Sequence, residues 1–356
     1  MTTIGLAMIV KNGAATMERA IKSVLPVVDE ISIVLGGQSS DNTVEIAAKY
    51  TDKLSEYEND SYFNFGQARQ QSVDQLTTDW VIWIDADEWV KGAQNIPAAI
   101  ALAETKEVNL ISIINENHGN RFAHKRIARR NSGRWVGAVH EYWQSDKRGL
   151  IVESITIQTI KKERSERNQQ NVEIGEAWIK DHPNDLRTLA HLARDYAIIG
   201  EDDRALQICR RYHRHYGQAD RDDELFFVNY IEAGLRMNIK DFDGAHLAAL
   251  RAVEARPDMG AAWAVAAETA FRLKCYELTV IMADKAISLG RPRSNWPLPM
   301  NVNTSAVSYV KALALVKMDR IREAIRALDV ALAFEPDNLN AGNLHITLCN
   351  QIGEMP

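Results

Sequence analysis

The sequence lacks the features that mark several large classes of protein. Its 356 residues contain only three cysteines, Cys209, Cys275 and Cys349, and no Cys-x-x-Cys pair, so neither a disulfide framework nor a zinc motif is indicated. No apolar run approaches the roughly 20 residues that a membrane-spanning helix needs. The net charge of −6 offers no general attraction for duplex DNA, and the first residues show no secretion signal. We therefore expect a soluble, reduced protein of the cytoplasm.

What the first 160 residues do contain is an alternation of short apolar runs and segments with helical periodicity. This order at this spacing implies right-handed crossovers and a mostly parallel sheet. Thr16 and a capping box over residues 42–45 are expected to start two of the helices. The expected strands are 4–10, 31–35, 54–57, 80–84, 108–114 and 150–160, and the expected helices are 17–25, 43–50 and 66–76.

The second half of the chain shows no convincing strand and carries an internal repeat. Turn-forming pairs recur every 34 to 45 residues, among them Pro183-Asn184, Pro257-Asp258 and Pro336-Asp337. Between them, alanines and leucines recur at helical spacing, which lets paired helices approach closely. This pattern resembles the tetratricopeptide repeat, a helix–turn–helix of about 34 residues. The alternative is a generic helical bundle. Residues 293–303 interrupt the pattern, and we expect an insertion there.

The most informative stretch is residues 80–89, where an apolar run ends in two carboxylates, Asp85 and Asp87. Ligands of open α/β sheets bind beyond the carboxyl ends of the strands. Side chains two residues apart in an extended segment point the same way, so the two aspartates can share one hard cation such as Mg²⁺ or Mn²⁺. The alternative is a solvated acidic turn after a strand.

Several segments in the right order make the first 160 residues resemble a family 2 glycosyltransferase with a GT-A fold. Residues 84–88 match the family's Asp-x-Asp signature, and residues 134–141 match a segment of lipopolysaccharide-core and peptide glycosyltransferases. The resemblance implies an α/β GT-A domain over residues 1–162, followed by an all-α tetratricopeptide-like domain over residues 163–356. This layout is similar to that of the bacteriocin S-glycosyltransferases. The other matching segments are residues 7–12, 21–25, 29–31, 39–43 and 68–69.

The resemblance also implies a nucleotide-sugar donor, with a UDP-sugar as the expected one, and a divalent cation. Arg126 and Arg129 are further candidates for phosphate contacts. His140 suits a metal of the Mn²⁺ type, and the alternative is a purely structural histidine. The residues implied for the nucleotide are Val10, Lys11, Asn12, Gly37, Arg69 and Asp85, and those implied for the metal are Asp85, Asp87 and His140.

Transfer of a sugar needs a general base that removes a proton from the acceptor. Glu141 and Glu88 are the candidates, and Glu141 is preferred. Inversion at the anomeric carbon is implied by the family. Two positions depart from it: Gly13 stands where the family usually has glutamate, and residues 36–37 are glycines where an aspartate usually ends the second strand.

Three functions remain open from the sequence. The first is a metal-dependent glycosyltransferase whose repeats hold a protein or peptide acceptor. The second is a glycosyltransferase acting on another acceptor, such as a lipopolysaccharide core sugar or a modified nucleobase in DNA, although the acidic charge disfavours nucleic acid. The third is an inactive repeat scaffold, against which the intact Asp85, Asp87 and His140 argue. The layout resemblance implies a homodimer.

Overall fold

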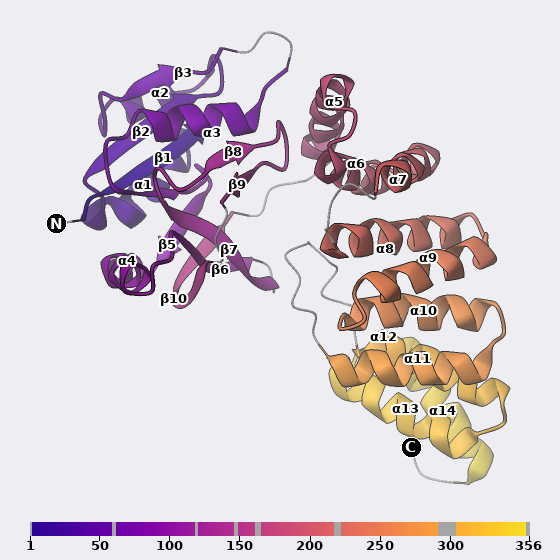
Figure 1. Cartoon of the computed structure of the whole chain (residues 1–356). Helices are drawn as coiled ribbons and strands as arrows, with labels where there is room; N and C mark the ends of the chain where they lie inside the picture. The colour runs from indigo at the N-terminus through magenta and orange to yellow at the C-terminus, as the bar shows by residue number, and fades with distance from the viewer. Residues whose placement is uncertain are drawn as a thin grey trace. The chain divides into compact units, whose positions relative to one another are not determined.

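The structure is a computed structural model that describes residues 2–58, 62–117, 120–145, 149–160, 165–216, 222–290 and 304–353. The chain divides into two compact units, residues 1–182 and residues 183–356 (Figure 1). The first unit includes helix α5 (Ser165–Asp181), which the sequence analysis placed with the repeats. The insertion expected at residues 293–303 lies outside the described residues.

The first unit is built on an eight-stranded sheet with the order β3-β2-β1-β4-β7-β6-β10-β5. Strands β3, β2, β1 and β4 run parallel, as predicted, whereas β7 is antiparallel to both of its neighbours, so the whole sheet is mixed. The parallel strands end at one edge, which we call the carboxyl edge. The strands are β1 (Ile4–Val10), β2 (Glu30–Leu35), β3 (Leu54–Glu56), β4 (Trp80–Trp83), β5 (Glu88–Lys91), β6 (Leu110–Asn117), β7 (Asn120–Arg129) and β10 (Leu150–Thr159), with β8 (Arg134–Val136) and β9 (Tyr142–Gln144) in a separate hairpin.

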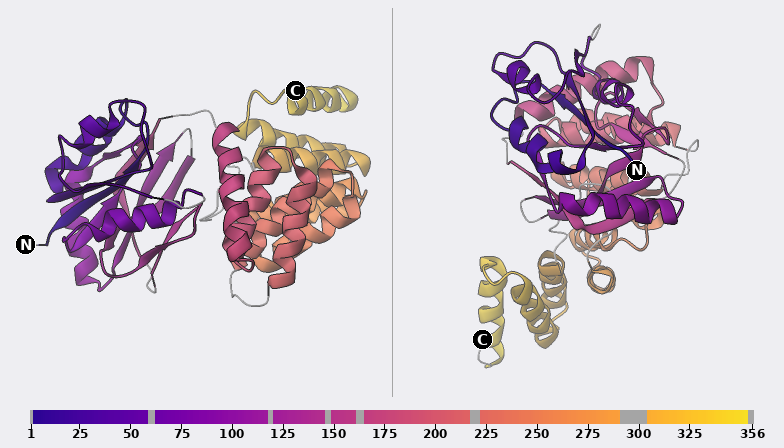
Figure 2. Two further views of the ribbon diagram at one scale, coloured as in Figure 1. Left: turned by 90° about the horizontal axis from the view of Figure 1, so that it is seen from above. Right: turned by 90° about the vertical axis from the view of Figure 1, so that its left-hand side faces the viewer.

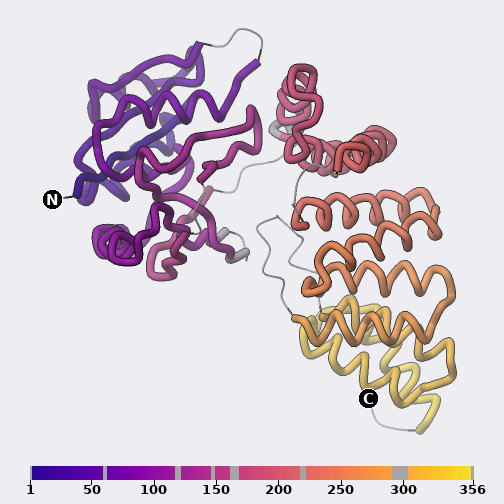
Figure 3. Tube along the Cα trace, viewed as in Figure 1, coloured from indigo at the N-terminus to yellow at the C-terminus, as the bar shows by residue number. Residues whose placement is uncertain are grey.

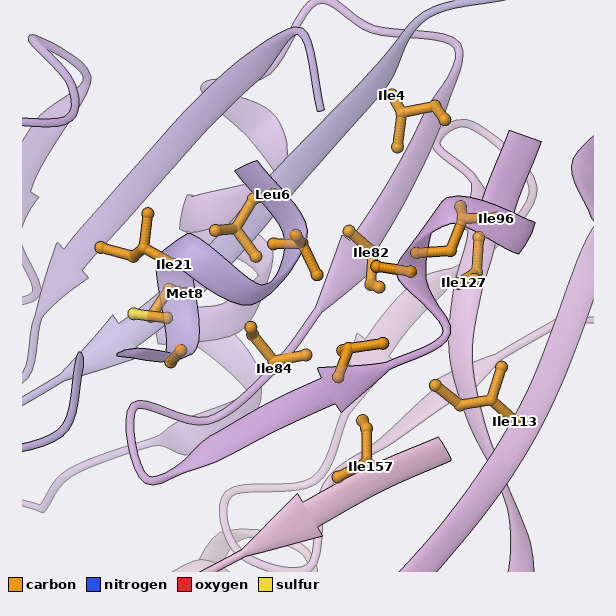
Figure 4. Close-up of a cluster of buried hydrophobic side chains, with 14 of the residues drawn as sticks. Ile4, Leu6, Met8, Ile21, Ile82, Ile84, Ile96, Ile113, Ile127 and Ile157 are labelled. Atoms are coloured by element: carbon orange, nitrogen blue, oxygen red, sulfur yellow. The ribbon is translucent and has the colours of Figure 1, made fainter. Parts of the chain in front are cut away.

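Both faces of the parallel strands are buried, because alternate residues point to opposite sides. On one face Leu6, Met8 and Ile82 pack with Ile21 from helix α1 (Met17–Val24) and with residues of helix α4 (Ile96–Thr105), as Figure 4 shows. On the other face Trp83 packs with Val73 of helix α3 (Phe65–Asp74). Each such side chain stabilises the fold by about 1.5–3 kcal/mol through removal of apolar surface from water.

Two helices begin at the predicted residues but lack the predicted side-chain caps. Thr16 stands at the N-cap of α1 but makes no capping hydrogen bond with its side chain. The capping box at residues 42–45 is also absent, and helix α2 (Thr43–Ala47) ends three residues early. Asp41 accepts hydrogen bonds from the amides of Thr43 (3.1 Å) and Ala14 (3.0 Å). A side chain that ties two loops together thus replaces the expected local cap.

The second unit consists, in its described part, of helices stacked as antiparallel pairs (Figures 2 and 3). The turn inside each pair carries one residue with a left-handed backbone, at Gly200, Lys240, Lys274 and Asp319. Alanines fill the space between the helices. The tetratricopeptide-like array is therefore confirmed. The helices are α6 (Leu186–Ile198), α7 (Asp202–His215), α8 (Asp222–Asn238), α9 (Phe242–Ala255), α10 (Gly260–Arg272), α11 (Tyr276–Leu289), α12 (Thr304–Lys317), α13 (Ile321–Phe334) and α14 (Leu339–Ile352).

Within the described ranges, none of the helices combines the length and the apolarity that crossing a bilayer requires.

Candidate active site

The loops that follow β1 and β2 are joined at the carboxyl edge by backbone and side-chain hydrogen bonds. The amide of Gly36 donates to the carbonyl of Val10 (2.8 Å), and the amide of Asn12 donates to Oγ of Ser39 (3.2 Å). The side chain of Asn12 accepts from the amide of Ser40 (2.8 Å). Asn12 itself has a left-handed backbone, with φ of 50°. These bonds hold the two loops, which contain most of the residues predicted for the nucleotide, as one rigid rim.

The glycines that depart from the family differ in the room that they leave for a side chain. A Cβ at Gly13 would lie 2.4 Å from Cγ2 of Val10 and 3.4 Å from Cβ of Ala86. A Cβ at Gly36 would lie 3.2 Å from the ring of Phe63. Gly37 has φ of 91° and is left-handed, and Nζ of Lys11 is its near neighbour. Val10 therefore crowds position 13 and Phe63 crowds position 36, whereas position 37 is open but has a left-handed backbone.

The Asp-x-Asp segment forms a turn. Strand β4 ends at Trp83, and the amide of Glu88 donates to the carbonyl of Asp85 (2.9 Å), which closes a turn over Ala86 and Asp87. The argument that an extended chain points both aspartates the same way is therefore wrong, because the chain reverses before β5 begins at Glu88. The turn brings Ala86 against Gly13, so both aspartates follow the strand at the same edge as the two loops.

Arg69 is the residue that joins the parts of the site. Its Nη2 lies 2.6 Å from Oδ1 of Asp85, and its Nε lies 2.6 Å from Oε1 of Glu141. The residue is 8% exposed, and its Nη1 is buried with no hydrogen-bond partner in the part of the chain that the structure describes. Burial alone would lower the pKa of Arg69, but the two carboxylates outweigh it and raise that pKa. Arg69 is therefore a fixed cation with one free donor.

Glu88 occupies a more enclosed position than Glu141. One carboxylate oxygen of Glu88 accepts from the amide of Asp85 (2.8 Å), and the other accepts from Nη2 of Arg126 (2.6 Å). Its side chain is 5% exposed, against 13% for that of Glu141. Burial raises the pKa of Glu88 to about 7, although the charge of Arg126 opposes the shift. One oxygen of Glu88 thus supports the aspartate turn, while Arg126 holds the other.

The structure does not place Arg126 and Arg129 as phosphate ligands. Arg126 is buried against Glu88, and Arg129 pairs with Glu104 at 3.0 Å, at the opposite edge of the sheet. Arg126 and Arg69 both reach the carboxyl edge, and Arg69 is the one of the three arginines that contacts Asp85 there. Neither ion pair carried a sequence signal, because both join residues more than 20 positions apart.

His140 lies in the loop between β8 and β9, next to Glu141. It is half-buried, and its backbone is left-handed with φ of 53°, which is uncommon for a residue other than glycine. Among the described residues, no three His, Cys, Asp or Glu side chains are gathered as a metal site. Asp87 nevertheless suits a hard cation, because Mg²⁺ is usually bound by one or two carboxylates together with substrate phosphates and water. Metal binding by Asp85, Asp87 and His140 remains a prediction.

Six of the residues predicted for the site fall into two groups. Lys11, Asn12 and Gly37 form the rim, and Arg69, Asp85 and Glu141 form one ion-pair network. Val10 is 5% exposed and contributes its backbone carbonyl and its packing. Three tryptophans lie beneath the network, with Trp83 centred 5.0 Å from Trp135 and 5.6 Å from Trp143. They pack against one another as core residues, and the centre of the Trp135 ring lies 5.1 Å from the Arg69 guanidinium.

Comparison with known proteins identifies the family that the first part of the chain matches. Residues 6–167 match the model of the family described as Glycosyl transferase family 2. This segment is a family 2 glycosyltransferase domain. The predicted glycosyltransferase class and the fusion to tetratricopeptide-like repeats are thereby confirmed.

The family 2 domain is followed by repeats that have relatives of their own. Over 88 residues the chain is 39% identical to a TPR repeat-containing protein of Synechococcus elongatus, a match that covers 25% of this chain and 21% of that protein. The chain thus spans about a fifth of that relative's length. Solved structures similar to part of the chain include YrrB, a TPR protein with an unusual peptide-binding site (14% identity, TM-score 0.42, 51% of this chain and 85% of that chain), and MamA (16%, 0.40, 49% and 86%).

Proposed function

We propose that this protein is a metal-dependent, inverting glycosyltransferase that moves a sugar from a nucleotide-sugar to a protein or peptide acceptor. The observation that carries the proposal is the bridge from Asp85 through Arg69 to Glu141. It links a carboxylate of the predicted donor site to the carboxylate best suited to act on an acceptor. The family 2 match supports the donor class, and a UDP-sugar is the donor we propose.

The donor side must offset the charge of a departing diphosphate. Asp87, with Asp85 and His140, would hold a divalent cation that neutralises charge on the phosphate oxygens. Arg69 contributes the free donor at Nη1, which is fixed because the other two nitrogens are held by Asp85 and Glu141. A group held in place before the reaction stabilises developing charge without reorganisation.

The acceptor side must remove one proton. The acceptor atom attacks the anomeric carbon, the bond from that carbon to the phosphate oxygen breaks, and the proton passes to Glu141. One oxygen of Glu141 is held by Arg69, which orients the carboxylate. Glu88 is a weaker candidate, because its two oxygens already accept hydrogen bonds from Asp85 and Arg126.

The repeats are proposed to bind the acceptor. Stacked helix pairs form an extended concave surface on which solenoid proteins bind their partners, and a peptide is the ligand we propose for it. Cytoplasmic location and a homodimer are part of the same proposal, the second by layout alone. A lipopolysaccharide or nucleic-acid acceptor has no specific feature of the described residues in its favour.

A donor-hydrolysis screen tests the proposal. The full-length protein is incubated with UDP-, GDP-, CDP- and dTDP-sugars, with Mn²⁺, with Mg²⁺ and with excess chelator. We expect slow hydrolysis of one class, with UDP favoured, that chelator abolishes and that Asp87→Asn lowers by orders of magnitude. Turnover unchanged by chelator would remove the metal from the proposal. No hydrolysis of any class, and no sugar transferred to any added peptide, would contradict the function.

A further inference from the structure

Helix α5 packs against the loop that carries His140 and Glu141. Ile174 of α5 is 4% exposed and lies in one apolar cluster with Ala138 and Val139 of that loop. Trp178, one turn further along the same face of α5, packs on the cluster and stacks on His182 with ring centroids 3.7 Å apart. The match to the family model ends at residue 167, near the start of this helix.

The loop is held by this cluster, by the start of α3, by the β8–β9 pairing on either side of it and by the ion pair of Glu141 with Arg69. Gly137 and His140 have left-handed backbones, with φ of 94° and 53°, so the loop is bent at two positions. The carbonyl of Ala138 accepts from the amide of Phe65 (2.8 Å), and a Cβ at Gly66 would lie 2.3 Å from the carbonyl of Gly137. The loop is thus in close contact with α3 on one side, while Val139 packs towards α5.

The same cluster reaches the rim of the donor site. Tyr62, Phe63 and Phe65 pack on it, and Phe63 contacts Phe65 edge-on with centroids 4.7 Å apart. The ring of Phe63 in turn lies against Gly36. Tyr62 and Trp178 of α5 thus pack on the same cluster, and burial, followed by the charge of Asp181 at the end of α5, raises the pKa of Tyr62.

We propose that α5 is a working part of the transferase site, in which Ile174 and Trp178 are positioning residues that hold the 137–141 loop and, through it, the carboxylate of Glu141. This inference rests on the proposed function. Because the Arg69 nitrogens are shared between Glu141 and Asp85, a loop that moves also loosens the donor side. A displacement of about 1 Å at a reacting group can lower a rate by about 100-fold.

The test uses the full-length protein and two measurements. Hydrogen exchange of peptides covering residues 62–69 and 137–143 reports the loop directly, because the Phe65 amide donates to Ala138. Steady-state donor hydrolysis and transfer report the reaction. We expect Ile174→Ala to speed exchange in both peptides about tenfold or more, to lower kcat about tenfold to 100-fold, and to leave KM for the donor nearly unchanged. Ile174→Val should recover most of both losses.

Two controls separate positioning from simple loss of stability. Glu173→Ala changes the exposed residue of α5 next to Ile174. Ile100→Ala removes a buried side chain of α4, which is 2% exposed, and opens a cavity there. Both should leave loop exchange and kcat at wild-type values. If Ile174→Ala does not fold, Ile174→Val and Trp178→Phe should show smaller changes in the same direction.

The outcomes are distinct for the two proposals. If loop exchange in Ile174→Ala equals wild type, or if Ile100→Ala lowers kcat equally, the positioning role is wrong. If the wild-type protein acts on no donor, the proposed function is wrong, and the exchange measurement still decides whether α5 holds the loop.

Discussion

The two edges of the sheet in the first unit carry similar polar and charged side chains, but these side chains differ in their hydrogen bonding. At the amino edge, Thr3 and Asp79 exchange hydrogen bonds, and Glu30 accepts from Lys53 (2.7 Å) and from the amide of Thr77 (2.9 Å). At the carboxyl edge, Arg69 keeps a buried donor without a partner in the described structure, and Glu88 has a raised pKa.

The difference separates an edge whose charged groups have partners within the protein from an edge at which we expect a ligand to bind. Burial raises the pKa of Glu30, but the bonds from Lys53 and Thr77 outweigh it and lower that pKa to about 2, so its ionised form stabilises the native state. Buried polar groups without partners destabilise a protein by about 1–3 kcal/mol. The buried Nη1 of Arg69 is such a group, and its place beside Asp85 fits a role in binding a ligand better than a role in stability.

The largest effect is expected from Glu141→Gln. Glutamine keeps the shape of the side chain but cannot accept the acceptor's proton, so transfer should fall by about 10²–10⁴-fold while donor affinity, measured by calorimetry, stays nearly constant. Glu104→Gln, at the amino edge, is the control and should transfer at the wild-type rate. Normal transfer by Glu141→Gln together with loss in Glu88→Gln would reverse the assignment of the base.

The second largest effect is expected from removal of the Arg69 side chain. Arg69→Met leaves Asp85 and Glu141 without their shared cation, and the free energy of unfolding should drop by about 3–5 kcal/mol, as for other buried ion pairs broken on one side. Arg129→Met breaks the half-exposed pair with Glu104 and should cost only about 0–1 kcal/mol. Urea unfolding of both variants measures the comparison, and equal losses would show that the two edges do not differ in this respect.

Ligands should stabilise the protein through the carboxyl edge. At 100 times its dissociation constant, UDP with Mn²⁺ should raise the free energy of unfolding by about 2.7 kcal/mol. Chelator or Asp87→Asn should remove most of this gain, whereas Glu30→Gln should keep it. Thermal melts with and without ligand provide the measurement, and an equal gain in chelator would contradict binding through a metal.

The smallest effect is expected at Glu30, and it depends on pH. Its pKa is about 2 in the folded state and about 4.5 when unfolded, so its stabilisation is present above pH 4.5 and is lost as the pH falls towards 2. Glu30→Gln should therefore lower the free energy of unfolding by about 2 kcal/mol at pH 7 and by progressively less below pH 4.5. The exposed Glu58→Gln should show no such trend, and a Glu30→Gln loss that is constant from pH 7 to pH 3 would contradict the shift.

Local pattern predicted much of the fold. Strand β1 was predicted with its observed ends, because an apolar run between polar residues has one interpretation at that length. Helix α2 begins where predicted but ends three residues early, and its start depends on Asp41, which also reaches Ala14 in another loop. Periodicity identified α5 as a helix but could not tell which unit it packs on.

The site was predicted as a set of residues and not as a network. Motif order placed Arg69, Asp85 and Glu141 in one site, but their ion pairs span 16 and 72 residues and have no sequence pattern. The role of Arg126 was missed for the same reason. The turn at Asp85 to Glu88 was missed because alternation along a strand cannot show where the strand stops.

The surroundings of Gly13 limit which substitutions this protein can accept there. Gly13→Glu alone does not fit this structure, because the new Cβ would lie 2.4 Å from Cγ2 of Val10. Val10→Ala would make room for this Cβ, but that substitution removes part of a buried side chain of the core. We expect each single change to lower stability and the two changes together to cost less than their sum, because the side chains at positions 10 and 13 compete for the same space. A larger side chain at position 13 is therefore coupled to a smaller one at position 10.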